Sequence, residues 1–79
     1  MKINIKYFGL LVELIGKNEE TLLLSDVCTV TTLINSLVEH YPQLEGKQFK
    51  VAVNQCLAAK DVLISEQDEV ALLPPFAGG

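Results

Sequence analysis

The 79-residue sequence is poor in the residues that most catalytic and metal sites use, with one histidine, two cysteines and no tryptophan. With only two tyrosines and three phenylalanines, aliphatic side chains must form the core. No stretch approaches the about 18 uninterrupted apolar residues of a transmembrane helix. Lys6 and Glu13 interrupt the apolar stretch near the start, which argues against a signal peptide. We therefore expect a cytoplasmic protein that does not enter a membrane.

The usual catalytic constellations are missing from the sequence. His40 is too isolated to build a metal site with Cys28 and Cys56, which have no C-x-x-C spacing. The serines lack a credible general base, and the few glycines form no phosphate-binding fingerprint. We therefore predict no metal site, no bound cofactor and no enzymatic activity of the chain on its own.

The charge balance and the two cysteines limit the partners and the compartment. The net charge is −4, and the six basic residues form no cluster along the sequence, which argues against nucleic acid as a ligand. An acidic chain of this kind suits a basic partner surface. Cys28 and Cys56 are interpreted as two buried small apolar residues in a reducing compartment, with a reactive Cys28 thiolate as the lesser alternative.

The first third of the chain predicts two strands that flank a short helix. Residues 2–8 alternate, with Ile3, Ile5 and Tyr7 on the inner face and Phe8 on the outer face. Residues 9–16 carry leucine and isoleucine at helical spacing between two glycines. Residues 20–25 form the second strand, and the short connection favours an antiparallel pair.

The strongest periodic signal predicts one long amphipathic helix, which is capped by Thr29 and ended by Pro42. Its apolar residues are Val30, Leu33, Ile34, Leu37, Val38 and Tyr41. Further strands are predicted at 49–53, 56–60 and 69–73, with a tight turn at Asn54-Gln55 and a polar turn at 65–68. In the first of these strands Phe49, Val51 and Val53 should face inward, and in the last Val70 and Leu72 should.

This order of elements predicts an α+β roll of about five strands in a single domain, residues 1–79. The first and last strands should be parallel neighbours at the centre of the sheet. Phe8 and Leu73 would then lie side by side on its outer face, as part of a partner-docking patch. Leu57 is a further candidate, although the turn before it leaves its facing open. Scattered surface apolar residues are the alternative interpretation.

The last six residues, 74–79, are predicted to form a protruding tail. Pro74 and Pro75 stop the preceding strand because each lacks a backbone N–H. Phe76 and Ala77 follow, and Gly78 and Gly79 place no side chain near the last carboxylate, so a narrow enzyme channel can admit the backbone. A frayed end or an expression scar is the alternative.

The Gly79 carboxylate is the one unusual reactive group that the sequence offers. It is ionised at neutral pH and is a poor electrophile as it stands. Joining it to AMP makes an acyl donor, and a sulfur nucleophile that displaces AMP leaves a thiocarboxylate on the tail. Such a tail suits delivery of sulfur inside a water-excluding active site of another protein.

Six short stretches together resemble the MoaD/ThiS family of ubiquitin-like sulfur carriers, in particular the small subunit of molybdopterin synthase. They are Lys6-Tyr7-Phe8-Gly9, Glu13-Leu14-Ile15-Gly16, Thr29-Val30, Val51-Ala52-Val53-Asn54-Gln55, Asp68-Glu69-Val70-Ala71 and Pro74-Pro75-Phe76-Ala77-Gly78-Gly79. The resemblance extends over essentially the whole length and implies the ubiquitin-like β-grasp fold.

The resemblance also implies a set of partners. A MoeB-type enzyme would consume ATP to adenylate Gly79, and a sulfur donor such as a cysteine desulfurase would provide the sulfur of the thiocarboxylate. The tail would then enter the large, MoaE-type subunit in a heterotetramer and donate sulfur to cyclic pyranopterin monophosphate. Catalytic residues are expected on the large subunit. The positions Phe8, Leu57 and Leu73 match the docking surface of the family.

One departure and several rival functions remain at this stage. Many family members have an arginine before the glutamate of the first helix, where this chain has Val12, so a polar contact from that turn is in doubt. A carrier of the same fold for thiamin thiazole synthesis or tRNA thiolation is the close alternative. A β-grasp interaction module without an activated C-terminus is the alternative from a different class.

Overall fold

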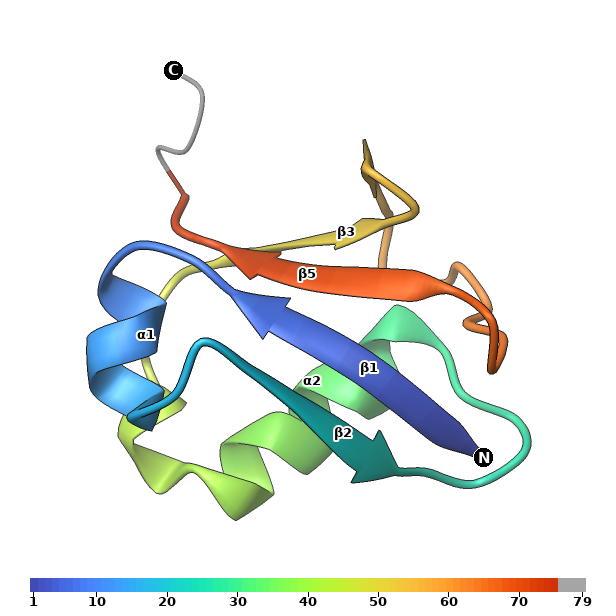
Figure 1. Cartoon of the computed structure of the whole chain (residues 1–79), viewed down its shortest axis with the longest axis horizontal. Helices are drawn as coiled ribbons and strands as arrows, with labels where there is room; N and C mark the ends of the chain where they lie inside the picture. The colour runs from blue at the N-terminus through green and yellow to red at the C-terminus, as the bar shows by residue number, and fades with distance from the viewer. Residues whose placement is uncertain (76–79) are drawn as a thin grey trace.

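The computed structural model describes residues 1–75 as a five-stranded mixed sheet with one main helix packed against it (Figure 1). The strand order is β2-β1-β5-β3-β4. The elements are β1 (Lys2–Tyr7), α1 (Leu10–Ile15), β2 (Glu19–Leu23), α2 (Val30–His40), the 3₁₀ turn η1 (Pro42–Leu44), β3 (Lys50–Val53), β4 (Cys56–Leu57) and β5 (Glu69–Leu73). This agrees with the predicted order of elements and confirms the α+β roll.

The strand β1 shows why the alternating pattern was informative. Ile3, Ile5 and Tyr7 are buried, and the residues between them are exposed. β1 pairs with β2 in antiparallel and with β5 in parallel orientation, and Ile5 lies between Glu20 and Val70. The predicted parallel pairing of the first and last strands is therefore confirmed, and β5 is the central strand of the sheet.

The helix α2 begins and ends where the sequence predicts. The Thr29 side chain accepts a hydrogen bond from the Thr32 backbone N–H at 3.2 Å, which satisfies one of the free donors of the first turn. Val30, Leu33 and Leu37 are buried against the sheet. The chain then enters η1, which the sequence analysis did not predict.

The short helix α1 lies between Gly9 and Gly16, as predicted. Its buried residues are Leu11 and Ile15, which are four positions apart and share one helix face. Leu10 remains 68% exposed. The Gly16 backbone adopts a left-handed conformation and donates to the Val12 carbonyl, which ends the helix after six residues.

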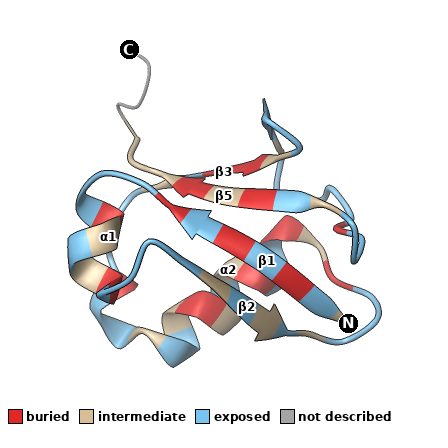
Figure 2. Cartoon of the chain, viewed as in Figure 1, coloured by how far each residue is buried: buried red, intermediate tan, exposed pale blue. Residues whose placement is uncertain are grey.

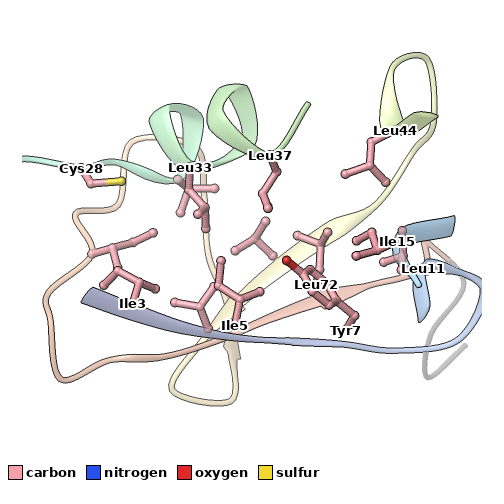
Figure 3. Close-up of a cluster of buried hydrophobic side chains, with 14 residues drawn as sticks. Ile3, Ile5, Tyr7, Leu11, Ile15, Cys28, Leu33, Leu37, Leu44 and Leu72 are labelled. Atoms are coloured by element: carbon pink, nitrogen blue, oxygen red, sulfur yellow. The ribbon is translucent and has the colours of Figure 1, made fainter. Parts of the chain in front are cut away.

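The core is almost entirely aliphatic and lies between the sheet and the helices (Figures 2 and 3). Its members are Ile3, Ile5, Tyr7, Leu11, Ile15, Cys28, Val30, Leu33, Leu37, Leu44, Val51, Ile64, Val70 and Leu72. Burying one such aliphatic side chain contributes about 1.5–3 kcal/mol. Packing of these side chains therefore holds the sheet and α2 together and stabilises the fold. In residues 1–75 we find no helix long and apolar enough to span a membrane.

The hairpin β3–β4 differs from the prediction in its second strand. Asn54 and Gln55 have φ values of 52° and 69°, which gives the tight turn that was expected. β4 contains only Cys56 and Leu57, so the predicted strand 56–60 was too long. The reason is that the Lys60 carbonyl accepts hydrogen bonds from both the backbone N–H and the hydroxyl of Thr31, which draws the chain toward α2.

The structure also corrects what was predicted for the two cysteines. Cys28 is buried as expected, but Cys56 is exposed because β4 lies at the edge of the sheet. Burial raises the pKa of the Cys28 thiol, which disfavours the reactive thiolate considered as an alternative. The predicted inward facing of Phe49, Val51 and Val53 is confirmed. Val51 is buried, and Val53 and Phe49 are half-buried and pack against the core.

Candidate functional site

The base of the tail forms where β5 ends. β5 stops at Leu73, as the two prolines predict, and Pro74 and Pro75 are half-buried beside the sheet. Phe76, Ala77, Gly78 and Gly79 lie outside the described residues, so the predicted roles of these four residues stay predictions. The structure therefore defines the point from which the tail departs.

Gly9 fixes that point through a close approach to Pro74. Its backbone has a φ of +61°, and a Cβ built on it would lie 2.6 Å from Pro74 Cγ. No side chain fits there without moving the proline ring. The Phe8 backbone N–H also donates to the Leu72 carbonyl at 3.2 Å, which extends the contact of β1 with β5. Sequence reasoning interpreted Gly9 only as a helix boundary and missed this contact.

The three predicted docking residues share the outer face of the sheet, opposite α2. Phe8 follows Tyr7 and Leu73 follows Leu72, and Tyr7 and Leu72 are paired inner-face residues. Leu57 pairs with Ala52, which in turn pairs with Ala71 of β5. Since directly paired residues point to the same face, the facing of Leu57 is resolved.

We call Phe8, Leu57 and Leu73 the outer-face patch. Phe8 is 45% and Leu57 63% exposed, whereas Leu73 is half-buried beside the tail. Lys6 lies on the same face and forms an ion pair with Glu69 at 3.3 Å. The patch thus combines apolar surface with a polar border, as docking surfaces do. That it binds a partner stays a prediction.

Hydrogen bonds hold the start of β5 to the β3–β4 turn. The Asn54 side-chain amide donates to Asp68 Oδ1 at 2.9 Å, and the Glu69 backbone N–H donates to Asn54 Oδ1 at 3.0 Å. The Ser65 backbone N–H donates to Asp68 Oδ2. The Ser65 N–H and the Asn54 amide together lower the pKa of Asp68. The predicted polar turn is therefore a bonded structure that orients the strand leading to the tail.

A polar cluster that the sequence analysis missed lies where β1 and β2 meet the end of α2, and we call it the closed corner. It consists of Tyr7, Lys17, Glu20 and Tyr41. The hydroxyls of Tyr7 and Tyr41 donate to Glu20 Oε2 at 2.5 and 2.6 Å, and Lys17 Nζ lies 3.5 Å from Oε1. No sequence pattern joins these residues, because register and the end of α2 bring them together.

The electrostatics of the closed corner keep the carboxylate ionised and the phenols neutral. Burial alone would raise the pKa of Glu20, but the hydrogen bonds from Tyr41 and Tyr7 and the charge of Lys17 outweigh it and lower that pKa. Burial and the bond to Glu20 raise the pKa of Tyr7 well above its ordinary value. The carboxylate is engaged on both oxygens, which indicates a stabilising role for it.

No cluster of three or more histidine, cysteine or acidic residues in the described part of the chain is arranged to hold a metal ion. His40, the only histidine, packs edge-on against the Tyr41 ring at a centroid distance of 4.9 Å. His40 lines a shallow hollow with residues 20–24 and Ser36, apart from the base of the tail. The geometry therefore directs attention to the base of the tail and the outer-face patch.

Comparison with known proteins adds the family. The model of the ThiS family matches residues 5–79. The chain belongs to the ThiS family. Two full-length relatives of this ThiS-family chain carry the name molybdopterin synthase sulfur carrier subunit. The Mycobacterium tuberculosis protein is 32% identical over 82 residues, covering 100% of this chain and 99% of its own length. The Chlamydomonas reinhardtii protein is 33% identical over 84 residues and is covered completely, as is this chain.

Solved structures agree on the ubiquitin-like β-grasp fold of the ThiS-family chain. A putative molybdopterin converting factor subunit 1 from Pyrococcus furiosus has a TM-score of 0.89 at 24% identity, with coverage of 95% and 98%. The Haloferax volcanii protein SAMP1 has a TM-score of 0.84 at 27% identity over 100% of both chains. A complex of molybdopterin-converting factor subunits 1 and 2 from Helicobacter pylori contains a chain with a TM-score of 0.67 at 20% identity and full coverage of both.

Within the ThiS-family fold, the structure explains how Val12 fits where the resemblance leads one to expect arginine. Val12 is half-buried and packs against the core cluster. Its hydrogen bonds come from the backbone alone: the N–H donates to the Gly9 carbonyl at 3.1 Å, and the carbonyl accepts from the Gly16 N–H at 2.8 Å. The side chain at this position therefore contributes to packing and makes no polar contact.

Proposed function

We propose that the chain is the sulfur-carrier subunit of a molybdopterin synthase. The observation that carries this proposal is the pair of full-length relatives at 32% and 33% identity that bear this name. The geometry supports it, because an exposed apolar patch lies beside the place where the tail leaves the fold. A carrier needs a stable folded domain, a docking surface and a C-terminal tail. The packed core, the outer-face patch and the tail that follows Pro75 correspond to these three requirements.

In this proposal the chemistry takes place on the Gly79 carboxylate. A MoeB-type enzyme joins the carboxylate to AMP and releases pyrophosphate from ATP. A donor such as a cysteine desulfurase carries the sulfur as a persulfide, whose terminal sulfur attacks the acyl carbon and displaces AMP. A thiol then reduces the resulting acyl disulfide, which leaves the thiocarboxylate on Gly79 and oxidises the thiol to a disulfide. The resulting thiocarboxylate passes its sulfur to cyclic pyranopterin monophosphate, and water restores the carboxylate. ATP is consumed by the activating enzyme, so the carrier itself needs no bound cofactor.

The large synthase subunit is the proposed recipient of the tail. The outer-face patch would dock on it, and residues 74–79 would extend into its active site, which provides the catalytic residues and excludes water. The Helicobacter pylori complex of subunits 1 and 2 supports such an assembly for this fold. We expect two carriers and two large subunits in a heterotetramer. Phe8, Leu57 and Leu73 are the residues expected at the interface, followed by Pro74, Pro75, Phe76 and Ala77.

A second candidate is a carrier or modifier that activates the same tail for another purpose. The 27% identity to the Haloferax volcanii protein SAMP1, with a TM-score of 0.84, favours considering it. Thiamin thiazole synthesis and tRNA thiolation are the other sulfur pathways that a carrier of this fold would serve. All these candidates share adenylation of Gly79 and differ in what accepts the activated tail.

The experiment that tests the proposal is an intact-mass measurement. The protein is incubated with a MoeB-type enzyme, ATP and a sulfur source, and the large subunit and cyclic pyranopterin monophosphate are added afterwards. We expect sulfur to replace one oxygen, and the sulfur to be lost only when both later components are present. Sulfur that is gained and not spent assigns the chain to another sulfur pathway. No gain of sulfur refutes the carrier function.

A further inference from the structure

Two adjoining hollows lie between α2 and the β3–β4 hairpin, on the side from which the tail departs. Their volumes are about 280 and 400 Å³, and both are lined by Ile34, Phe49, Lys50 and Lys60. Lys47, Gln48 and Pro75 also line the larger one. We call this feature the lysine groove, because the apolar residues Ile34 and Phe49 and three lysines line it together.

The charge of the groove contrasts with that of the chain. The net charge is −4, yet three of the six basic residues line this one groove, although the sequence scatters them. In residues 1–75, Lys6 and Lys17 each form an ion pair with a carboxylate. Lys47, Lys50 and Lys60 have no carboxylate within 4.0 Å in the same region. Gathered like charges of this kind favour the approach of an anionic group.

The groove connects the two features that the proposed function uses. Pro75, at the base of the tail, lines the larger hollow, and Leu57 of the outer-face patch lines the smaller one. A protein that covers the patch and takes up the tail therefore passes over the groove. The backbone of Lys60 is held by two hydrogen bonds from Thr31, so this rim of the groove is fixed to α2.

We propose that the lysine groove binds an acidic segment of the large synthase subunit, the protein proposed to receive the tail. Carboxylates of that segment face Lys47, Lys50 and Lys60, and an apolar side chain rests on Ile34 and Phe49. This inference rests on the proposed function, since it needs a protein that takes up the tail. A second copy of the chain suits the groove less, because two chains that each carry a net charge of −4 repel each other as they approach.

The expected benefit is mainly kinetic. Complementary charges at an interface raise the association rate and orient the encounter more than they add final affinity. The three lysines would draw the partner toward the base of the tail before the apolar patch makes contact. The effect should disappear at about 1 M salt, where the Debye length falls to about 3 Å.

The test compares the double variant Lys47→Glu/Lys60→Glu with the control Lys2→Glu, an exposed lysine at the start of β1 that lines neither hollow. Association of each full-length chain with the large subunit is followed by stopped flow at low and high salt. We expect the double variant to associate at least about 10-fold more slowly than wild type at low salt, and with a smaller difference at high salt. Lys2→Glu should change the rate less than about 2-fold.

The inference is overturned if the double variant associates with the large subunit as fast as Lys2→Glu does. Failure of the proposed function is distinguishable, since the wild-type chain would gain no sulfur. The control Lys2→Glu, which lies outside the groove, should become thiocarboxylated as the wild type does.

Discussion

Tyr7 and Phe8 are adjacent aromatic residues at the end of β1, and the fold treats them in opposite ways. Tyr7 is 2% exposed, and its hydroxyl is bound to Glu20 in the closed corner. Phe8 is 45% exposed on the outer-face patch. Side chains on the inner face are buried and hydrogen-bonded within the chain. Phe8 and Leu57 on the outer face and the lysines of the groove can instead contact a partner. Stability and docking should therefore be separable by mutation.

The largest effect on stability is expected in the core. Leu37→Ala removes a fully buried side chain of α2 and should lower the free energy of unfolding by about 2–5 kcal/mol, because it loses burial and leaves a cavity. The control Leu10→Ala, at an exposed site, should change it by less than about 0.5 kcal/mol. Urea denaturation measures both. Equal losses of unfolding free energy would show that burial does not distinguish the two sites.

The outer-face patch is expected to affect docking. Phe8→Asp places an unpaired charge in the proposed interface and should weaken binding to the large subunit by about 10- to 100-fold. Leu73→Asp should act in the same direction. Leu23→Asp, an exposed leucine on β2, is the matched control for the added charge. Calorimetry gives the affinities, and an unchanged affinity of the Phe8 variant would remove the patch from the interface.

Gly9 lies between the core and the base of the tail. Its substitution should therefore both lower stability and change the structure around Pro74. Gly9→Ala strains a backbone with a φ of +61° and brings a Cβ to 2.6 Å from Pro74 Cγ, so we expect a loss of about 1–3 kcal/mol. Gly46→Ala has a similar φ of +80° and nothing within 4 Å, so it reports backbone strain alone. NMR shifts at Leu73 and Pro75 should change only in the Gly9 variant. The same shifts in both variants would contradict the contact with Pro74.

The smallest effect is expected in the closed corner, and it depends on pH. The folded pKa of Glu20 is lowered, so its contribution to stability is present above the unfolded pKa of about 4.3 and is lost as the pH falls through the folded pKa. Glu20→Gln should cost about 1 kcal/mol at neutral pH and flatten this acid dependence. Glu19→Gln serves as the exposed control. Parallel pH profiles of wild type and Glu20→Gln would refute the assignment.

The comparison also explains how much of the fold could be predicted. Alternation in β1 and β5 and the spacing of Val30, Leu33 and Leu37 gave the strands, the helix and the parallel central pair, because burial acts at local periods. β4 was predicted too long, since the bonds that Thr31 donates to the Lys60 carbonyl come from another part of the chain.

The same reason limits what could be predicted of the candidate site. The outer positions of Phe8 and Leu73 followed from alternation. The closed corner and the lysine groove could not be found in this way, because they join residues from separate elements. Glu20 and Tyr41, for example, are 21 positions apart and meet only in the folded chain. Gly9 carried a signal, but its partner Pro74 becomes visible only when β1 and β5 are paired.

The most direct test of the account is sulfur transfer by chains that differ only at the tail. One variant lacks Gly79 and another carries one added residue after it, and each is compared with wild type in the complete assay with cyclic pyranopterin monophosphate. The account predicts no transfer from either variant, with the free energy of unfolding and the affinity of the outer-face patch unchanged within about 0.5 kcal/mol. Full transfer from either variant would contradict the role of the Gly79 carboxylate.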